Sequence, residues 1–243
     1  MTQASDNGGD DRGNGAMQTP PVVSRAEWDA AHVRMHGREK EVMRARDALA
    51  AERRRMPWLR IEKDYAFEGP DGRVGLRDLF GRCRQLIVYR AFLEPGVSRW
   101  PERGCIGCSL VADHAVHPVH LQQRDTTYAF VSRGSQDDLA RQKAKMGWEH
   151  IPWYTLTDDF DADFGVDAWH GTNVFFRDGD QIFRTYFVSG RGDEQMGNLW
   201  NWLDITPLGR QEKWEDSPPG YPQTDPYDWW VWHDNREAEP ERE

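Results

Sequence analysis

The sequence of 243 residues lacks the features that mark several common protein classes. It has no apolar run of about 18 residues, the length that a membrane-spanning helix needs. Residues 1–19 are rich in Gly, Asp, Asn and Gln, with no apolar stretch that could form the core of a secretory signal. These absences predict a cytoplasmic protein that does not act at a membrane.

Cysteine is scarce as well, with three in the whole chain, which excludes a small scaffold held together by disulfides. The sequence contains no glycine-rich phosphate loop and no dinucleotide-binding fingerprint, so we expect no internally bound nucleotide. If the protein uses reducing power, an external thiol must supply it.

The chain has no excess of basic residues. Its net charge is -10, and most of the acidity lies at the ends. Residues 211–243 hold ten acids and three bases, and residues 1–20 hold three acids and one base, so the middle is nearly neutral. Nucleic-acid binding depends on a basic surface that neutralises phosphates, and we therefore expect no nucleic-acid partner.

Composition divides the chain into four parts. With a mean hydropathy of -0.85, some of its length must be solvated. We expect a disordered tail over residues 1–22, an amphipathic helical arm over 23–57, a main domain over 58–210 and an acidic, Trp-rich tail over 211–243.

The arm opens with Ser24 and Glu27 at capping-box spacing and should end before Pro57. Its apolar residues follow helical spacing at Trp28, Ala31, Met35, Val42, Ala45 and Leu49. We expect the arm to pack on the main domain or on a second subunit. The cluster Trp229-Trp230-Val231-Trp232 should likewise anchor the tail on the domain or on a partner, which predicts a homo-oligomer formed through the arm or the tail.

The pattern of expected elements predicts an α/β fold for the main domain. A hairpin at 65–76 precedes a buried strand, a helix, a second strand, a second helix, a short extended piece, another hairpin and a last helix. We place these elements at residues 85–92, 106–122, 126–131, 135–147, 153–156, 174–187 and 193–203. This is the order of a thioredoxin-like fold.

The chemistry-bearing motif is Cys105-Ile106-Gly107-Cys108, which falls after the first buried strand and at the start of a helix. Free backbone N–H groups and the helix dipole favour a thiolate there. Cys105 is therefore the candidate catalytic nucleophile and Cys108 the candidate resolving thiol. The third cysteine, Cys83, enters a strand and is expected in the core.

Several strings resemble the DUF899 family over roughly residues 24–210. They include Gly104-Cys105-Ile106-Gly107-Cys108-Ser109, residues 44–54, residues 62–72, Met146-Gly147-Trp148, Asp163-Phe164-Gly165-Val166, Arg177-Asp178-Gly179-Asp180 and Leu203-Asp204-Ile205-Thr206-Pro207. The resemblance implies a thioredoxin-like fold and a thiol-disulfide activity.

Around the last hairpin, the chain departs at three places from the proteins that it resembles. Thioredoxins place a cis-proline opposite the Cys pair, and that place reads Gly171-Thr172-Asn173 here. The family hairpin has His where this chain has Arg184, and the family's Tyr-Ala-Arg-Gly segment is Ser189-Gly190-Arg191-Gly192. Arg191 is thus a candidate for binding an anionic substrate.

Aromatic residues in loops are further candidates for the substrate site. Trp100, Trp148, Trp153 and Trp169 fall where this fold gathers loops near the Cys pair, so they could wall an apolar pocket. We name Trp100 and Trp169 as substrate-binding candidates. Ordinary core packing is the alternative for all four.

Four histidines suggest an alternative hypothesis, in which the Cys pair is part of a metal site. His114, His117 and His120 recur at near-helical spacing, and His170 precedes the last hairpin. Together with Cys105 and Cys108 they would make a soft site suited to copper or zinc.

Three hypotheses follow. The first is an oxidoreductase that needs no cofactor and uses Cys105 and Cys108 on a disulfide or a peroxide, recycled by an external thiol reductant; the peroxidase pattern Pro-x-x-x-Thr-x-x-Cys is absent. The second is a copper or zinc protein that acts on a thiol-containing small molecule. The third is a non-enzymatic binding or oligomerisation module.

Overall fold

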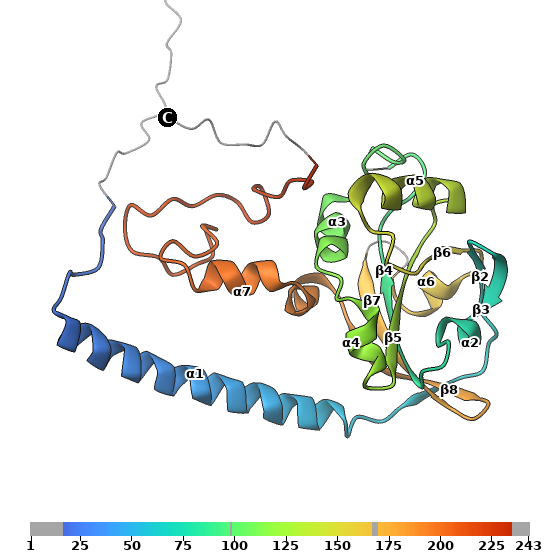
Figure 1. Cartoon of the computed structure of the whole chain (residues 1–243), viewed down its shortest axis with the longest axis horizontal. Coiled ribbons are helices and arrows are strands. Elements are labelled where there is room, and N and C mark those ends of the chain that lie inside the picture. The colour runs from blue at the N-terminus through green and yellow to red at the C-terminus, as the bar shows by residue number, and fades with distance from the viewer. Residues whose placement is uncertain (1–16, 98, 167–169, 235–243) are drawn as a thin grey trace, which may run out of the picture.

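The computed structural model describes residues 17–97, 99–166 and 170–234. A long helix, α1 (Arg25–Arg53), extends away from a twisted sheet that carries helices on both faces, and the C-terminal segment returns across the gap between them (Figure 1). The remaining helices are α2 (Leu76–Leu79), α3 (Ile106–Asp113), α4 (Pro118–Gln122), α5 (Gln136–Met146), α6 (Phe160–Asp163), the 3₁₀ helix η1 (Gly190–Met196) and α7 (Asn198–Asp204).

The strands in the described ranges form one eight-stranded sheet in the order β1-β8-β7-β4-β5-β6-β2-β3. They are β1 (Leu59–Ile61), β2 (Ala66–Gly69), β3 (Gly72–Gly75), β4 (Gln85–Arg90), β5 (Thr126–Ser132), β6 (Trp153–Leu156), β7 (Gly171–Asp178) and β8 (Gln181–Val188).

The centre of the sheet confirms the predicted thioredoxin-like fold. Strand β4 pairs in parallel with β5 and antiparallel with β7, which in turn forms a hairpin with β8. The chain order strand, helix, strand, helix, hairpin, helix is therefore arranged in space as β8-β7-β4-β5, with β6 and the β2–β3 hairpin added beyond β5.

Strand β4 separates two apolar cores. Because side chains alternate across a strand, Leu86 and Val88 enter one core while Ile87 and Tyr89 face the other. The first core packs against α2 and α6, and the second contains Cys108 together with residues of α5. The candidate thiols thus belong to one defined face of the sheet. Cys83 is buried, as predicted.

The predicted single helix over 106–122 is wrong, because the structure divides it into α3 and α4. Proline at the first turn of α4 fixes a new helix start at Pro118, and His117 is the residue before it, where helical dihedrals are disfavoured. The predicted last helix is also divided: η1 ends before Gly197, and α7 begins at Asn198.

The arm forms the predicted helix, and most of it is exposed. Ser24 accepts a hydrogen bond from the Glu27 backbone N–H, and the Glu27 side chain accepts one from the Ser24 backbone, as the capping box predicts. No residue of α1 is buried, and Trp28, Val42 and Leu49 are exposed. At the end of the arm, the Arg53 guanidinium carbon lies 5.1 Å from the ring centroid of Tyr186 in β8. Packing of the arm on the main domain or on a second subunit stays a prediction.

The C-terminal segment is organised around Glu212, which is 2% exposed. Its carboxylate accepts hydrogen bonds from the indoles of Trp214 and Trp229 and from the backbone N–H of Tyr227. One buried carboxylate thus ties together three points of a segment that has almost no regular secondary structure.

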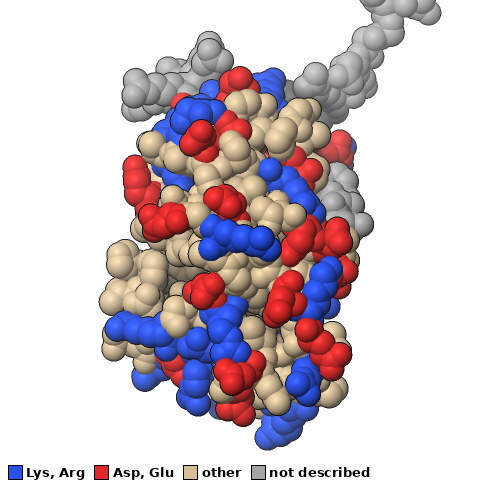
Figure 2. Space-filling model, turned by 90° about the vertical axis from the view of Figure 1, so that its right-hand side faces the viewer, with Lys and Arg blue, Asp and Glu red and all other residues tan. Residues whose placement is uncertain are grey.

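Acidic and basic side chains are interspersed on the face shown in Figure 2, and neither sign forms a continuous field there. Among the described helices, none is long and apolar enough to cross a bilayer.

Candidate active site

Cys105 lies at the junction between a loop and α3, as its helix N-cap residue. The preceding Gly104 has a φ of 83°, and a Cβ there would lie 2.2 Å from the Cδ2 atom of Leu93. Only glycine satisfies both the left-handed backbone and this close approach. The local sequence therefore fixes how the loop presents Cys105 to the helix.

The Cys105 sulfur lies in an environment that favours the thiolate. A hydrogen bond from the Cys108 thiol is the largest influence, and burial opposes it. The backbone N–H groups of Cys108 and Gly107 and the charge of His170 add to the stabilisation, and together these lower the Cys105 pKa to about 6. Cys105 is partly exposed, so this thiolate remains open to small reactants.

Cys108 lies one helical turn further on and is fully buried. Burial raises its pKa, and so does the neighbouring Cys105. Its sulfur accepts a hydrogen bond from the Phe92 backbone N–H at 3.1 Å and makes another with the Tyr89 hydroxyl. Burial likewise raises the pKa of Tyr89, so this hydroxyl remains a proton donor. Cys108 is thereby kept as a neutral thiol behind the exposed one.

His170 lies immediately before β7, close enough to Cys105 for its charge to favour the thiolate. Its Nδ1 lies 2.8 Å from a carboxylate oxygen of Asp193, whose other oxygen accepts a hydrogen bond from Thr172 Oγ1 at 3.0 Å. The bond to Asp193 raises the His170 pKa, and the Cys105 thiolate adds to this effect. Asp193 is 3% exposed, so the buried carboxylate orients the imidazole and stabilises its protonated form.

This arrangement gives the two cysteines different chemistry. Cys105 is a stabilised thiolate beside an imidazole that favours its protonated form, and Cys108 is a protonated thiol within hydrogen-bonding distance of it. Sequence reasoning named both thiols and His170, but it missed Tyr89, Thr172 and Asp193. These three residues come from β4, β7 and η1, and no local sequence pattern indicates that the fold brings them together at the Cys pair.

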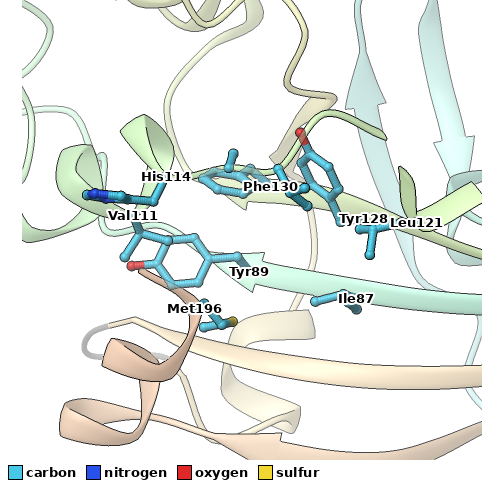
Figure 3. A pocket seen from close by; sticks show the side chains of 10 residues that line it. Ile87, Tyr89, Val111, His114, Leu121, Tyr128, Phe130 and Met196 are labelled. Atoms are coloured by element: carbon cyan, nitrogen blue, oxygen red, sulfur yellow. The ribbon is translucent and has the colours of Figure 1, made fainter. Parts of the chain in front are cut away.

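An apolar pocket of about 230 Å³ lies beside the site, between β4, β5, α3, α4 and η1. Tyr89 forms one wall, with Met196 on one side of its ring and Phe130 on the other (Figure 3). Because Tyr89 also contacts Cys108, the pocket and the Cys pair share a side chain. Trp100, Trp148 and Trp153, proposed from the sequence as pocket walls, are not among its lining residues.

Trp100, Trp148 and Trp153 are buried in the core that contains Cys108, as core packing requires, and a substrate-binding role for Trp100 stays a prediction. Trp100 fits against Gly134, where a Cβ would lie 2.4 Å from its ring. The prediction for Trp169 lies outside the described residues.

Arg191 lies in η1 and contacts the C-terminal segment. Its guanidinium carbon is 3.8 Å from the ring centroid of Trp214, and its Nε is 3.5 Å from a Glu194 carboxylate oxygen. These contacts account for the side chain within the folded chain, and a role for Arg191 with an anionic substrate stays a prediction.

The histidines of the proposed metal site do not gather at the Cys pair. His114 Nδ1 contacts the Leu110 carbonyl, and His117 caps α4 and stacks on His150. His120 faces His117 across 6.2 Å, and only His170 lies near Cys105. Among the described residues, no group of three or more His, Cys, Asp or Glu side chains is disposed to hold a metal ion. Copper or zinc binding stays a prediction that metal analysis can test.

Comparison with solved structures finds distant likenesses. A thiol:disulfide interchange protein from Bacteroides sp. is 13% identical, with 65% of this chain and 94% of that chain covered and a TM-score of 0.42. A putative thiol:disulfide interchange protein DsbE from Chlorobium tepidum is 14% identical, covering 58% and 93%, with a TM-score of 0.37. Peroxiredoxin Q from Xanthomonas campestris is 16% identical, covering 54% and 87%, with a TM-score of 0.33.

Likenesses this distant say nothing about which molecule the chain acts on. No protein with curated annotation was found to match the sequence. The model of one family, described as a bacterial protein of unknown function (DUF899), matches residues 17–236. The chain, with its thioredoxin-like sheet and its Cys105–Cys108 pair, therefore belongs to the DUF899 family.

Proposed function

We propose that this protein is a thiol-disulfide oxidoreductase in which Cys105 is the nucleophile and Cys108 the resolving thiol. The observation that carries the proposal is the difference between the two sulfurs: the Cys105 pKa is lowered to about 6, whereas burial raises that of Cys108. Thiol-disulfide exchange needs one thiolate to attack first and a second thiol held ready behind it.

The first step is attack of the Cys105 thiolate on one sulfur of a substrate disulfide. A bond forms between Cys105 and that sulfur, the substrate S–S bond breaks, and the second substrate sulfur leaves as a thiolate. The departing thiolate takes up a proton, which the protonated His170 can donate, with Asp193 holding its ring. The product is a mixed disulfide on Cys105.

The second step is attack of Cys108 on the Cys105 sulfur. Cys108 gives up its proton, the Cys105–Cys108 bond forms, and the bond between Cys105 and the first substrate sulfur breaks. That sulfur leaves as a thiolate and takes up the proton. The substrate has gained two electrons and the protein has lost two. An external thiol reductant returns the pair to the dithiol. A hydroperoxide could replace the disulfide as oxidant, with Cys105 attacking oxygen, but the sequence lacks the peroxidase pattern.

The test is turnover of a small disulfide with dithiothreitol as the reductant. We expect wild-type protein to catalyse the exchange and Cys105→Ser to abolish catalysis, because no other described thiol is exposed. Cys83→Ser is the matched control, since Cys83 is buried away from the pair, and it should retain full turnover. Undiminished turnover in Cys105→Ser would contradict the proposal.

A further inference from the structure

The C-terminal residues 227–234, which we call the Trp segment, lie over the N-terminus of α3. A Cβ placed on Gly107 would come within 2.6 Å of the Cζ3 atom of Trp230. Gly107 is one of the two residues between the paired cysteines. Trp232 packs against the core that holds Cys108, which Cys105 also contacts. Two indole rings from the far end of the chain therefore adjoin the Cys pair.

Charged residues hold the Trp segment on this surface. Asp234 lies 2.6 Å from Arg103 and 3.3 Å from Lys145, and the guanidinium of Arg103 lies 5.3 Å from the ring centroid of Trp232. Arg103 is two residues before Cys105, so this attachment is next to the nucleophile. The Trp segment is thus tied to the loop that presents Cys105 and to the neighbouring helix α5.

A second attachment lies at the other end of α3. His233 Nδ1 is 2.7 Å from a carboxylate oxygen of Asp113, which also accepts a hydrogen bond from the indole of Trp148 at 2.7 Å. Trp230 is held between two further rings, with its centroid 4.3 Å from that of Tyr227 and 6.2 Å from that of Trp200. These contacts, together with those of Glu212, hold the Trp segment in a defined position against α3.

We infer that the Trp segment covers the approach to Cys105. It thereby limits the substrate of Cys105 to a small molecule and excludes disulfides on folded proteins. The inference rests on the proposed function, because it concerns the partner of the same thiolate. A protein disulfide could reach Cys105 only if a polypeptide surface lay across the start of α3, where Trp230 already lies. The partial exposure of Cys105 leaves room for a small disulfide to approach.

The experiment measures how reagent size affects modification of Cys105. The reduced full-length protein is treated with N-ethylmaleimide or with a polyethylene glycol chain carrying the same maleimide, and Cys105 labelling is followed by peptide mass spectrometry. With a cysteine peptide as reference for intrinsic reactivity, we expect the polymer to label wild-type Cys105 at least about tenfold more slowly than the small reagent, as for a site that opens only locally.

Two substitutions should remove this discrimination. Gly107→Ala puts a methyl group where the Trp230 ring lies. Asp234→Asn removes the ion pairs that join the Trp segment to Arg103 and Lys145. In each variant, labelling by the polymer should rise about tenfold while N-ethylmaleimide labelling changes little. Gly37→Ala is the matched control, since nothing lies within 4 Å of its new methyl group, and it should behave like wild type.

The inference is overturned if wild-type Cys105 reacts with both reagents in the ratio found for the peptide, or if both variants keep the wild-type discrimination. Labelling needs no turnover, so these outcomes do not depend on the proposed function. A companion assay with insulin disulfides separates the two claims. Turnover of a small disulfide without turnover of insulin supports both claims. Turnover of insulin overturns only the inference about the Trp segment. No turnover of either substrate contradicts the proposed function.

Discussion

Two cysteines in one short motif differ because their surroundings differ. Cys105 is the N-cap residue of α3, where backbone N–H groups and the Cys108 thiol donate hydrogen bonds to its sulfur. Cys108 points into the core and meets Tyr89. At the scale of single residues, burial and hydrogen bonding decide which sulfur reacts first.

The pH dependence of alkylation tests this difference. The Cys105 rate should follow a single ionisation near pH 6, high above this value and falling as pH drops below it, because only the thiolate reacts. His170→Asn removes a positive charge that favours the thiolate, so the midpoint should move upward. Each unit of upward shift lowers the thiolate fraction about tenfold at a pH below the midpoint.

His150→Asn is the control for this measurement, because His150 stacks on His117 and not on the Cys pair. Its midpoint should match that of wild type. An unmoved midpoint in His170→Asn, or a wild-type midpoint at the ordinary thiol value, would contradict the geometry described for the site.

Sequence reasoning placed the Cys pair correctly in the fold, because that position is set locally. The spacing of Cys105 and Cys108, their place after a buried strand, and the start of a helix were all visible in the sequence. Asp193 and Tyr89 were not, because a carboxylate in a turn and a tyrosine in an apolar run look ordinary until the fold brings them together. Trp100 is buried against Gly134, and its part in binding substrate stays a prediction.

At the scale of elements, the end of β4 is held by a buried ion cluster next to the loop that leads to Cys105. Arg90 is 1% exposed and pairs with Glu94 and with Asp161, which also accepts hydrogen bonds from Arg133. The sequence predicted the buried strand but not the partners of its terminal arginine, because Asp161 and Arg133 come from α6 and from the residue that follows β5.

Asp161→Ala tests the importance of this cluster. Removing the carboxylate leaves the buried Arg90 with fewer compensating charges, and we expect the free energy of unfolding to fall by about 3–5 kcal/mol. Urea unfolding followed by tryptophan fluorescence measures the change. Asp180→Ala, which breaks an exposed pair with Arg77, should leave the unfolding midpoint unchanged. Equal effects of the two substitutions would contradict this account.

At the scale of the whole molecule, two appendages differ in how they meet the domain. The C-terminal segment loops out beyond α7 and returns to α3 near its end, whereas α1 projects outward (Figure 1). The apolar side chains of α1 are exposed. Composition indicated both segments. It could not say which of them would contact the domain, because that depends on Gly107 and Asp113, residues distant in sequence.

The exposed arm predicts self-association. Val42 and Leu49 lie on one side of α1 at helical spacing, and a second copy is the partner that the sequence analysis proposed. We expect sedimentation equilibrium to give a dimer or larger assembly for wild type, and a monomer for a variant carrying Val42→Lys and Leu49→Lys. A monomeric wild-type protein at the same concentration would contradict this prediction.

The most direct test of the central claim is to trap the intermediate on Cys105. Reduced Cys108→Ser protein is mixed with a small disulfide, quenched with acid, digested and analysed by peptide mass spectrometry. The account predicts a mixed disulfide on the peptide that contains Cys105 and none on the peptide that contains Cys83. An unmodified Cys105, or an adduct found only on Cys83, would contradict the claim that Cys105 is the attacking thiolate.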